Sequence, residues 1–181
     1  MELNRGLRAS QQGHLDCLCG IYSLVNTLAY LYDGRVKRKS LINALLRSYK
    51  YHYDIYDLMT NGLDDDEMDH LIQSTLQKGY YNKHYPLTIT KPYHQQTNLR
   101  SKHIIKNIIT FINSKNNFHQ RIVLIGTQEH WSIIIGADKR YFYFFDSNGN
   151  IKAQHCSFSL IPKRTRHTLF SSAIYFIERL F

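Results

Sequence analysis

Apolar residues recur every three or four positions in several segments of the first two thirds of the chain, which is the spacing that lines one face of an α-helix. The pattern predicts helices at about 20–32, at about 39–49, from Asp64 to Lys78 and from Ser101 onwards. Asp64 and Glu67 have the spacing of a capping box at the start of the third helix. The stretch that contains Pro86 and Pro92 is predicted as a loop.

The last third of the chain contains short runs rich in β-branched and aromatic residues, which are typical of strands. Strands are predicted at about 121–126, 131–137, 141–146, 151–155 and 173–178. Helices followed by antiparallel strands describe an α+β domain. With 181 residues, of which 43% are hydrophobic, the chain fits a single domain spanning residues 1–181.

The segment QQGHLDCLCGIYSLVN, from Gln11 to Asn26, places two cysteines at the start of the first helix. A thiol at a helix start lies in the positive field of the helix end, which favours the nucleophilic thiolate. Cys19 lies at the first turn and precedes Gly20, which allows another part of the chain to approach closely. We therefore favour Cys19 over Cys17 as a nucleophile, although a cysteine in this position taken alone is more often a structural core residue.

The segment GTQEHWSIIIGADKRYFYFFDSNGN, from Gly126 to Asn150, supplies a base and an acid. His130 stands at the start of one predicted strand and Asp146 at the end of the next. The start of one strand lies beside the end of the next in an antiparallel pair, so we expect these two residues to be neighbours. A carboxylate beside an imidazole fixes its tautomer and stabilises its protonated form, as a base for a thiol requires. The predicted catalytic residues are thus Cys19, His130 and Asp146.

This order of a glutamine, Cys-Gly at a helix start, His-Trp opening a strand and Asp at the end of the next strand resembles papain-like cysteine proteases. Within that group it is most similar to the compact bacterial peptidase domains of double-glycine leader-processing transporters, which also place an acid shortly before the cysteine, as Asp16 is here. The resemblance covers 11–26 and 126–150 and hardly extends to 49–120. It implies a papain-like fold in which the N-terminal nucleophile helix packs on a C-terminal antiparallel sheet, with the site in the cleft between them.

In that family a glutamine six positions before the cysteine helps to hold the oxyanion. Gln12 lies seven positions before Cys19, whereas Gln11 lies six before Cys17. We expect Gln12 to act with the Cys19 backbone N–H, and one such donor is typically worth about 2.7–4 kcal/mol. Cys17 with Gln11 remains open as the alternative pair.

The resemblance implies a cysteine endopeptidase with a possible Gly-Gly target. A domain of this kind without an attached transporter is similar to papain-like toxins of interbacterial competition. Such effectors are delivered by specialised secretion or contact-dependent systems into the cytoplasm of a target cell, where they cleave an essential protein, and an immunity protein holds them off. Some of them act on type II DNA topoisomerases, so the expected partners are a protein substrate, such as one of these topoisomerases, and an acidic immunity protein.

The sequence contains no run of about eighteen apolar residues, so no membrane span is expected. Its first residues lack the apolar stretch of a signal peptide, and three cysteines do not suggest a disulfide scaffold. We therefore expect synthesis in the reducing bacterial cytoplasm. The ten histidines show no spacing typical of a metal site, and no cofactor or metal is expected.

The net charge of +9 is spread over three basic stretches at 35–39, 100–106 and 163–166. Such stretches are more often solvated faces than nucleic-acid sites, so direct nucleic-acid binding is not expected. The alternative functions are a glutamine deamidase or transglutaminase with the same triad, a cell-wall amidase, and a basic nucleic-acid-binding or interaction module whose cysteines are structural. An amidase would be expected to carry an export signal or a wall-binding module.

Overall fold

The computed structural model describes residues 6–13, 16–114, 120–164 and 166–180. The helices, together with one π-helical turn (η1) and one 3₁₀ turn (η2), are α1 (Cys19–Leu31), α2 (Arg38–Lys50), α3 (Ile55–Asn61), α4 (Asp65–Leu71), η1 (Ile72–Leu76), α5 (Gly79–His84), α6 (Ser101–Ile112) and η2 (His155–Ser157). The strands are β1 (Leu87–Thr90), β2 (Arg121–Thr127), β3 (Trp131–Ala137), β4 (Tyr141–Phe144), β5 (Lys152–Gln154), β6 (Phe158–Ser159) and β7 (His167–Arg179). None of the helices in these ranges has the length and apolar character needed to cross a membrane.

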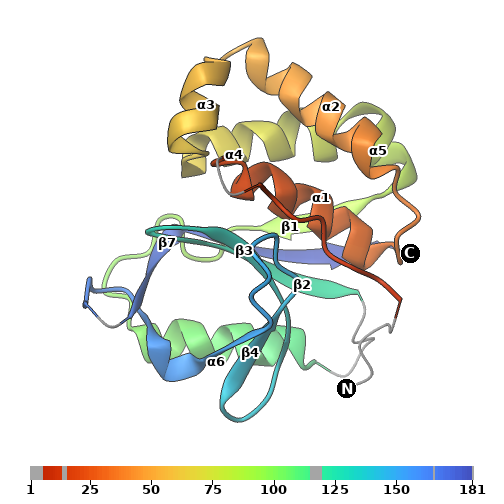
Figure 1. Cartoon of the computed structure of the whole chain (residues 1–181). Helices are drawn as coiled ribbons and strands as arrows, with labels where there is room; N and C mark the ends of the chain where they lie inside the picture. Colours follow the sequence, from red (N-terminus) through yellow and green to blue (C-terminus); the bar gives the residue numbers. More distant parts are fainter. Residues whose placement is uncertain (1–5, 14–15, 115–119, 165, 181) are drawn as a thin grey trace.

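The strands form one sheet in the order β1-β7-β2-β3-β4-β5, in which every neighbouring pair is antiparallel. The short strand β6 pairs in parallel with the start of β7. Helices α1 to α5 form a layer on one face of the sheet, and α6 covers part of the other face (Figure 1). The chain therefore has the predicted α+β class.

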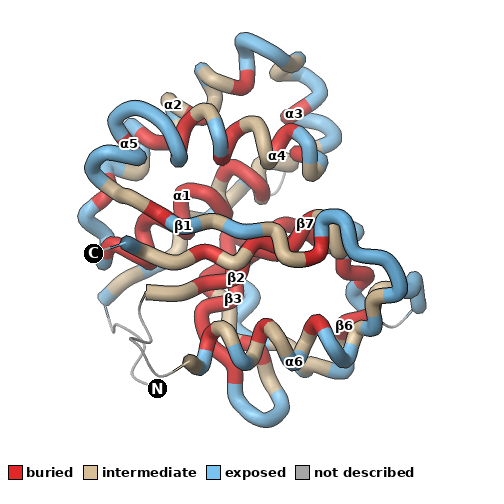
Figure 2. Tube along the Cα trace, turned by 180° about the vertical axis from the view of Figure 1, so that it is seen from behind, coloured by how far each residue is buried: buried red, intermediate tan, exposed pale blue. Residues whose placement is uncertain are grey.

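Alternation along the central strands divides the interior into two cores. On β2, Ile122 and Leu124 pack in the core under the helical layer, whereas Val123 and Ile125 pack in the core under α6. Helix α1 is almost wholly buried because it lies between the sheet and the outer helices (Figure 2). The predicted packing of the first helix on the sheet is confirmed.

All four predicted helix starts lie within one residue of those observed. The predicted capping box is present: the Asp64 side chain accepts from the Glu67 N–H at 2.8 Å, and the Glu67 side chain accepts from the Asp64 N–H at 3.0 Å. The predicted helix from Asp64 to Lys78 is shorter, since it becomes a π-helical turn that ends at Leu76. The prediction of a plain loop around Pro86 was wrong, because α5 and β1 occupy much of that stretch. Helix α3 and the first half of β7 were not predicted.

A close contact joins the helical layer to the sheet beside the start of α1. Trp131, the first residue of β3, donates from Nε1 to the carbonyl oxygen of Leu63 at 2.7 Å. A Cβ added to Gly20 would lie 2.7 Å from Cδ1 of Leu63, which is closer than real Cβ contacts. A larger residue after Cys19 would require the Leu63 side chain to shift, so glycine lets the connection between α3 and α4 cross close to the helix start. The close approach predicted at Gly20 is confirmed.

Candidate active site

Cys19 is the first residue of α1, and its position depends on a loop braced by Asp16. The Asp16 carboxylate accepts hydrogen bonds from the N–H of Gly13 at 2.8 Å and from the N–H of Leu18 at 3.2 Å. The thiol is partly buried, and its Sγ lies 4.0 Å from the carbonyl oxygen of Cys17. The first N–H groups of a helix have no partner within the helix, so the Cys19 N–H can serve an anion at this end. Residues 14 and 15 of this segment lie outside the described residues.

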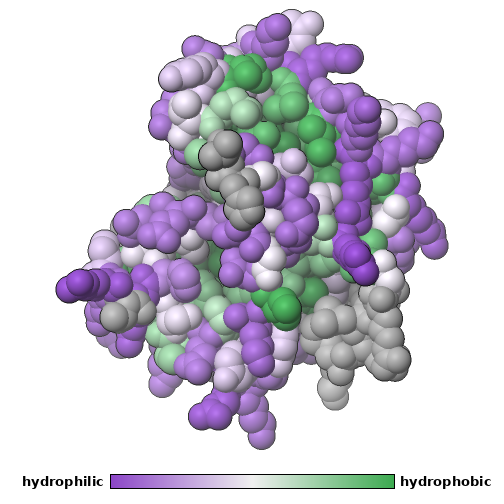
Figure 3. All heavy atoms as spheres, in the orientation of Figure 1, coloured by the Kyte–Doolittle hydropathy of each residue, from purple (hydrophilic) through white to green (hydrophobic). Residues whose placement is uncertain are grey.

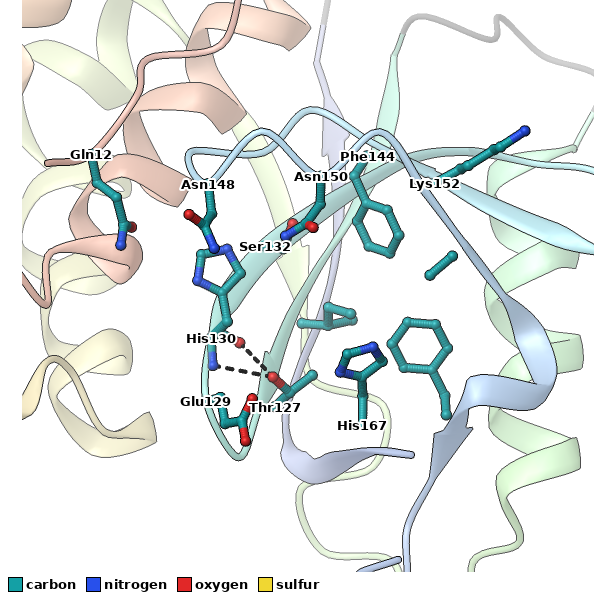
Figure 4. Close-up of a pocket in the computed structure, with 13 residues that line it drawn as sticks. Gln12, Thr127, Glu129, His130, Ser132, Phe144, Asn148, Asn150, Lys152 and His167 are labelled. Carbon is teal, nitrogen blue, oxygen red and sulfur yellow. Dashed lines mark hydrogen bonds between the residues drawn. The ribbon is translucent and has the colours of Figure 1, made fainter. Parts of the chain in front are cut away.

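His130 stands in a tight turn immediately before β3, where Thr127 holds its backbone. The Thr127 N–H donates to the His130 carbonyl oxygen at 2.9 Å. Oγ1 of Thr127 donates to the same oxygen at 3.0 Å and accepts from the His130 N–H at 3.2 Å (Figure 4). Nε2 of His130 lies 2.6 Å from Oδ1 of Asp146. The predicted proximity of His130 and Asp146 is therefore confirmed.

The Asp146 side chain is fully buried and accepts five hydrogen bonds. Besides His130, the hydroxyl of Ser132 donates to Oδ1 at 2.7 Å. Oδ2 accepts from the N–H of Asn148 at 3.1 Å, from the N–H of Asn150 at 3.2 Å and from Nδ2 of Asn150 at 2.9 Å. Burial raises the pKa of Asp146. The hydrogen bonds from His130 and Ser132, the charge of His130 and the hydrogen bond from the Asn150 N–H lower it by more than burial raises it, so the pKa lies below its usual value.

Sequence reasoning missed the three residues that support Asp146. The signal for Asn148 and Asn150 was present, because Asp-Ser-Asn-Gly-Asn after a strand is typical of a turn in which an aspartate accepts from backbone N–H groups that follow it. Ser132 gave no such signal, since a serine in a strand is informative only when its cross-strand neighbours are known.

The imidazole of His130 connects Asp146 with Cys19. Because Nε2 contacts Asp146, Nδ1 is the ring nitrogen that is left for the Cys19 thiol. Burial lowers the pKa of His130, but hydrogen bonds with Asp146 and Cys19, together with the charges on both, outweigh burial and raise the pKa from 6.5 to about 9. His130 is therefore protonated at neutral pH and can both stabilise a thiolate and supply a proton.

We expect NMR titration of wild-type protein to place the His130 imidazole at a midpoint of about pH 9. Since the pKa is raised in the folded state, the folded protein binds the proton more tightly than the unfolded chain. The stability that this proton contributes is complete below pH 6.5 and is lost as the pH rises through about 9. A midpoint near 6.5 in the wild-type protein would contradict the contacts with Asp146 and Cys19.

The structure separates the two glutamine and cysteine pairs. Gln12 donates its backbone N–H to the Ser147 carbonyl oxygen at 3.1 Å, and its Oε1 accepts from the Ser147 hydroxyl at 3.0 Å. Its amide Nε2 is thereby left as a donor, and its side chain lines the same pocket as His130 (Figure 4). Gln11 is exposed, and Cys17 donates from Sγ to the Thr60 carbonyl oxygen at 3.2 Å, at the end of α3. The geometry thus favours Gln12 with Cys19.

The basic stretches lie on different elements. Residues 35–39 lead into α2, residues 100–106 begin α6, and the described part of 163–166 lies between β6 and β7. On the face shown in Figure 3, hydrophilic side chains are dispersed over the surface, and apolar ones gather mainly over the helical layer.

Within the described residues, no group of three or more histidine, cysteine or acidic side chains could hold a metal ion.

Comparison with protein-family models and with curated proteins finds no match to this chain. The function is therefore argued from the geometry of the site and from its chemistry.

Proposed function

We propose that this protein is a papain-like cysteine endopeptidase with Cys19 as the nucleophile. The observation that carries the proposal is the position of His130 between the Cys19 thiol and the buried carboxylate of Asp146. A structural cysteine needs neither a protonated histidine beside it nor a buried acid that orients that histidine. Nucleophile, base and orienting acid together are the requirement for covalent acyl transfer.

The geometry supports a two-step reaction. The Cys19 thiolate attacks the peptide carbonyl carbon, and the oxygen becomes an anion held by the Cys19 N–H and by Nε2 of Gln12. His130 then gives its proton to the leaving amine nitrogen, the C–N bond breaks, and an acyl-thioester remains. His130, now neutral, takes a proton from water, which attacks the thioester, and the acid leaves with Cys19 restored. Asp146 keeps the imidazole oriented throughout.

The resemblance carries the proposal further, to a toxin that cleaves a cytoplasmic protein of a competing bacterium after delivery into that cell. The proposed target site is Gly-Gly, and a type II DNA topoisomerase is the proposed substrate. A chain with net charge +9 suits an acidic immunity protein that covers the cleft.

The test is to add purified protein to a bacterial lysate and to purified type II topoisomerase, and to map new N-termini by mass spectrometry. Proteolysis yields new chain ends in the treated samples. A gain of about one dalton at glutamine side chains without chain cleavage would instead show a deamidase, which forms the same thioester from a side-chain amide. If neither chain cleavage nor deamidation occurs at any protein concentration, the proposal of an enzyme is refuted.

Replacing Gln12 by alanine is expected to lower kcat by about 10²–10³-fold, because one of two oxyanion donors is lost. Gln11→Ala is the matched control, since the Gln11 side chain is exposed, and it should keep kcat within a factor of about two. Steady-state kinetics on a cleaved peptide measures both. The opposite result, with loss only in Gln11→Ala, would support the pairing of Gln11 with Cys17.

A further inference from the structure

A cavity of about 440 Å³ lies beside His130 on the opposite face of the sheet from Cys19. Its lining is mixed: Ile125, Phe144, Ala153 and Phe158 supply apolar surface from β2, β4, β5 and β6, and polar residues, among them Asn148 and Asn150, supply the rest. All four apolar residues belong to the core under α6 or pack against it, whereas Cys19 packs against the core under the helical layer. His130 and Gln12 both line the cavity, so it opens beside the proposed catalytic groups.

Aromatic rings enclose the cavity from several directions. Phe144 from β4 and His167 from the start of β7 point into it in the close-up view, and Lys152 lines its edge with the amine directed outward (Figure 4). The rings of Phe158 and His167, which both line the cavity, are in contact with each other, with centroids 5.4 Å apart. Rings in such an arrangement favour another aromatic ring in offset or edge contact.

The reaction places part of the substrate at this cavity. The leaving amine takes its proton from His130, so the residues that follow the scissile bond must pass the imidazole. Cys19 packs against the core under the helical layer, whereas the apolar wall of the cavity belongs to the core under α6 and His130 lines the cavity. A side chain of the leaving segment can therefore enter the cavity without crossing the nucleophile.

We propose that this cavity binds a bulky apolar side chain, aromatic in particular, from one of the two residues that follow the scissile bond. The proposal rests on the proposed endopeptidase function, because it is the leaving amine that brings the substrate to His130. Its volume is within the range of ordinary ligand pockets, and filling it removes apolar surface of both partners from water. The site thus selects substrates by the residues after the cut, in addition to any selection before it.

The first experiment is cleavage of a proteome-derived peptide library by the wild-type protein. Peptides with Phe, Tyr, Trp or Leu at one of the two positions after the cut should be cleaved at least about tenfold faster than matched peptides with Gly there. In Ala153→Phe the new ring fills the cavity, so this preference should fall about tenfold. Gln154→Phe adds the same ring one position away, at an exposed residue of β5 that does not line the cavity, and should retain the preference. Wild-type cleavage without any preference at these positions would overturn the proposal.

The second experiment does not depend on catalysis. The Cys19→Ala protein is titrated with the free-amine peptides Phe-Ala-Ser-Lys and Gly-Ala-Ser-Lys and with their Ala-Phe and Ala-Gly counterparts, and binding is measured by calorimetry. One of the two Phe peptides should bind at least about tenfold more tightly than its Gly counterpart, and Ala153→Phe should abolish the difference. Equal binding of Phe and Gly peptides would overturn the proposal. Tighter binding of a Phe peptide without cleavage of any library peptide would support the cavity as a side-chain site and refute the endopeptidase alone.

Discussion

Cys19→Ala is expected to lower kcat for peptide cleavage by a factor on the order of 10⁶, because alanine cannot form the acyl-thioester. The fold should survive, since the thiol is only partly buried and its contact with the Cys17 carbonyl oxygen is long at 4.0 Å. Growth of bacteria that express each variant, together with proteome-wide mapping of new N-termini, measures the effect in cells. Purified protein and a cleaved peptide give the rate constant.

Cys17→Ala is the matched control, because it removes the neighbouring thiol from the same loop. Cys17 donates to the Thr60 carbonyl oxygen at the end of α3, and loss of that contact should cost about 1 kcal/mol of unfolding free energy or less. Its kcat should stay within a few-fold of wild type. Loss of cleavage in Cys17→Ala, with activity kept in Cys19→Ala, would contradict the assignment and move the nucleophile to Cys17.

Asp146→Asn is expected to lower kcat by a factor on the order of 10⁴. Oδ2 of Asp146 accepts three hydrogen bonds from Asn148 and Asn150, and an amide nitrogen in that place would face donors only. If the amide rotates instead, its nitrogen faces the donors of His130 and Ser132. Either way the imidazole loses a charged acceptor, so both its orientation and its protonated form are weakened.

The pH dependence gives this substitution a signature that a merely structural defect lacks. In the wild type, kcat/KM should fall as the pH rises through about 9, where His130 loses its proton. In Asp146→Asn the pKa of His130 should be lower, since the hydrogen bond and the charge that raise it are weakened or gone, and the fall should occur at lower pH. Kinetics across pH 5–10 and NMR of His130 measure the shift.

Asp138→Asn is the control for Asp146→Asn. Asp138 is also a carboxylate of the same hairpin that accepts backbone hydrogen bonds, from Arg140 and Tyr141, but it lies at the turn between β3 and β4. The Asp138→Asn substitution should leave the pH dependence of kcat/KM unchanged. Full activity of Asp146→Asn with an unaltered pH profile would show that Asp146 does not orient a catalytic histidine.

Long elements with a clear pattern were predicted correctly, and so were the short strands β4 and β5. Helices α1, α2 and α6 carry a helical repeat over 12 or 13 residues, and strands β2 and β3 are seven-residue runs rich in apolar residues; all five start within one residue of the prediction. Helices α3 and α5 have seven and six residues, too few to show a face. Strand β1 forms because β7 offers it an edge, which no local pattern records.

The sequence by itself determined the contact between His130 and Asp146, because a hairpin brings the start of one strand to the end of the next. It also determined the capping box and the helix that begins at the cysteine pair, since these depend on residues a few positions apart. Only the tertiary structure bears on the choice between the two cysteines and between the two glutamines, and it favours Cys19 with Gln12. That choice depends on contacts such as the one between Gln12 and Ser147, which are 135 positions apart. The cavity beside His130 is of the same kind, since separate strands build its walls and local periodicity carries no information about which strands meet.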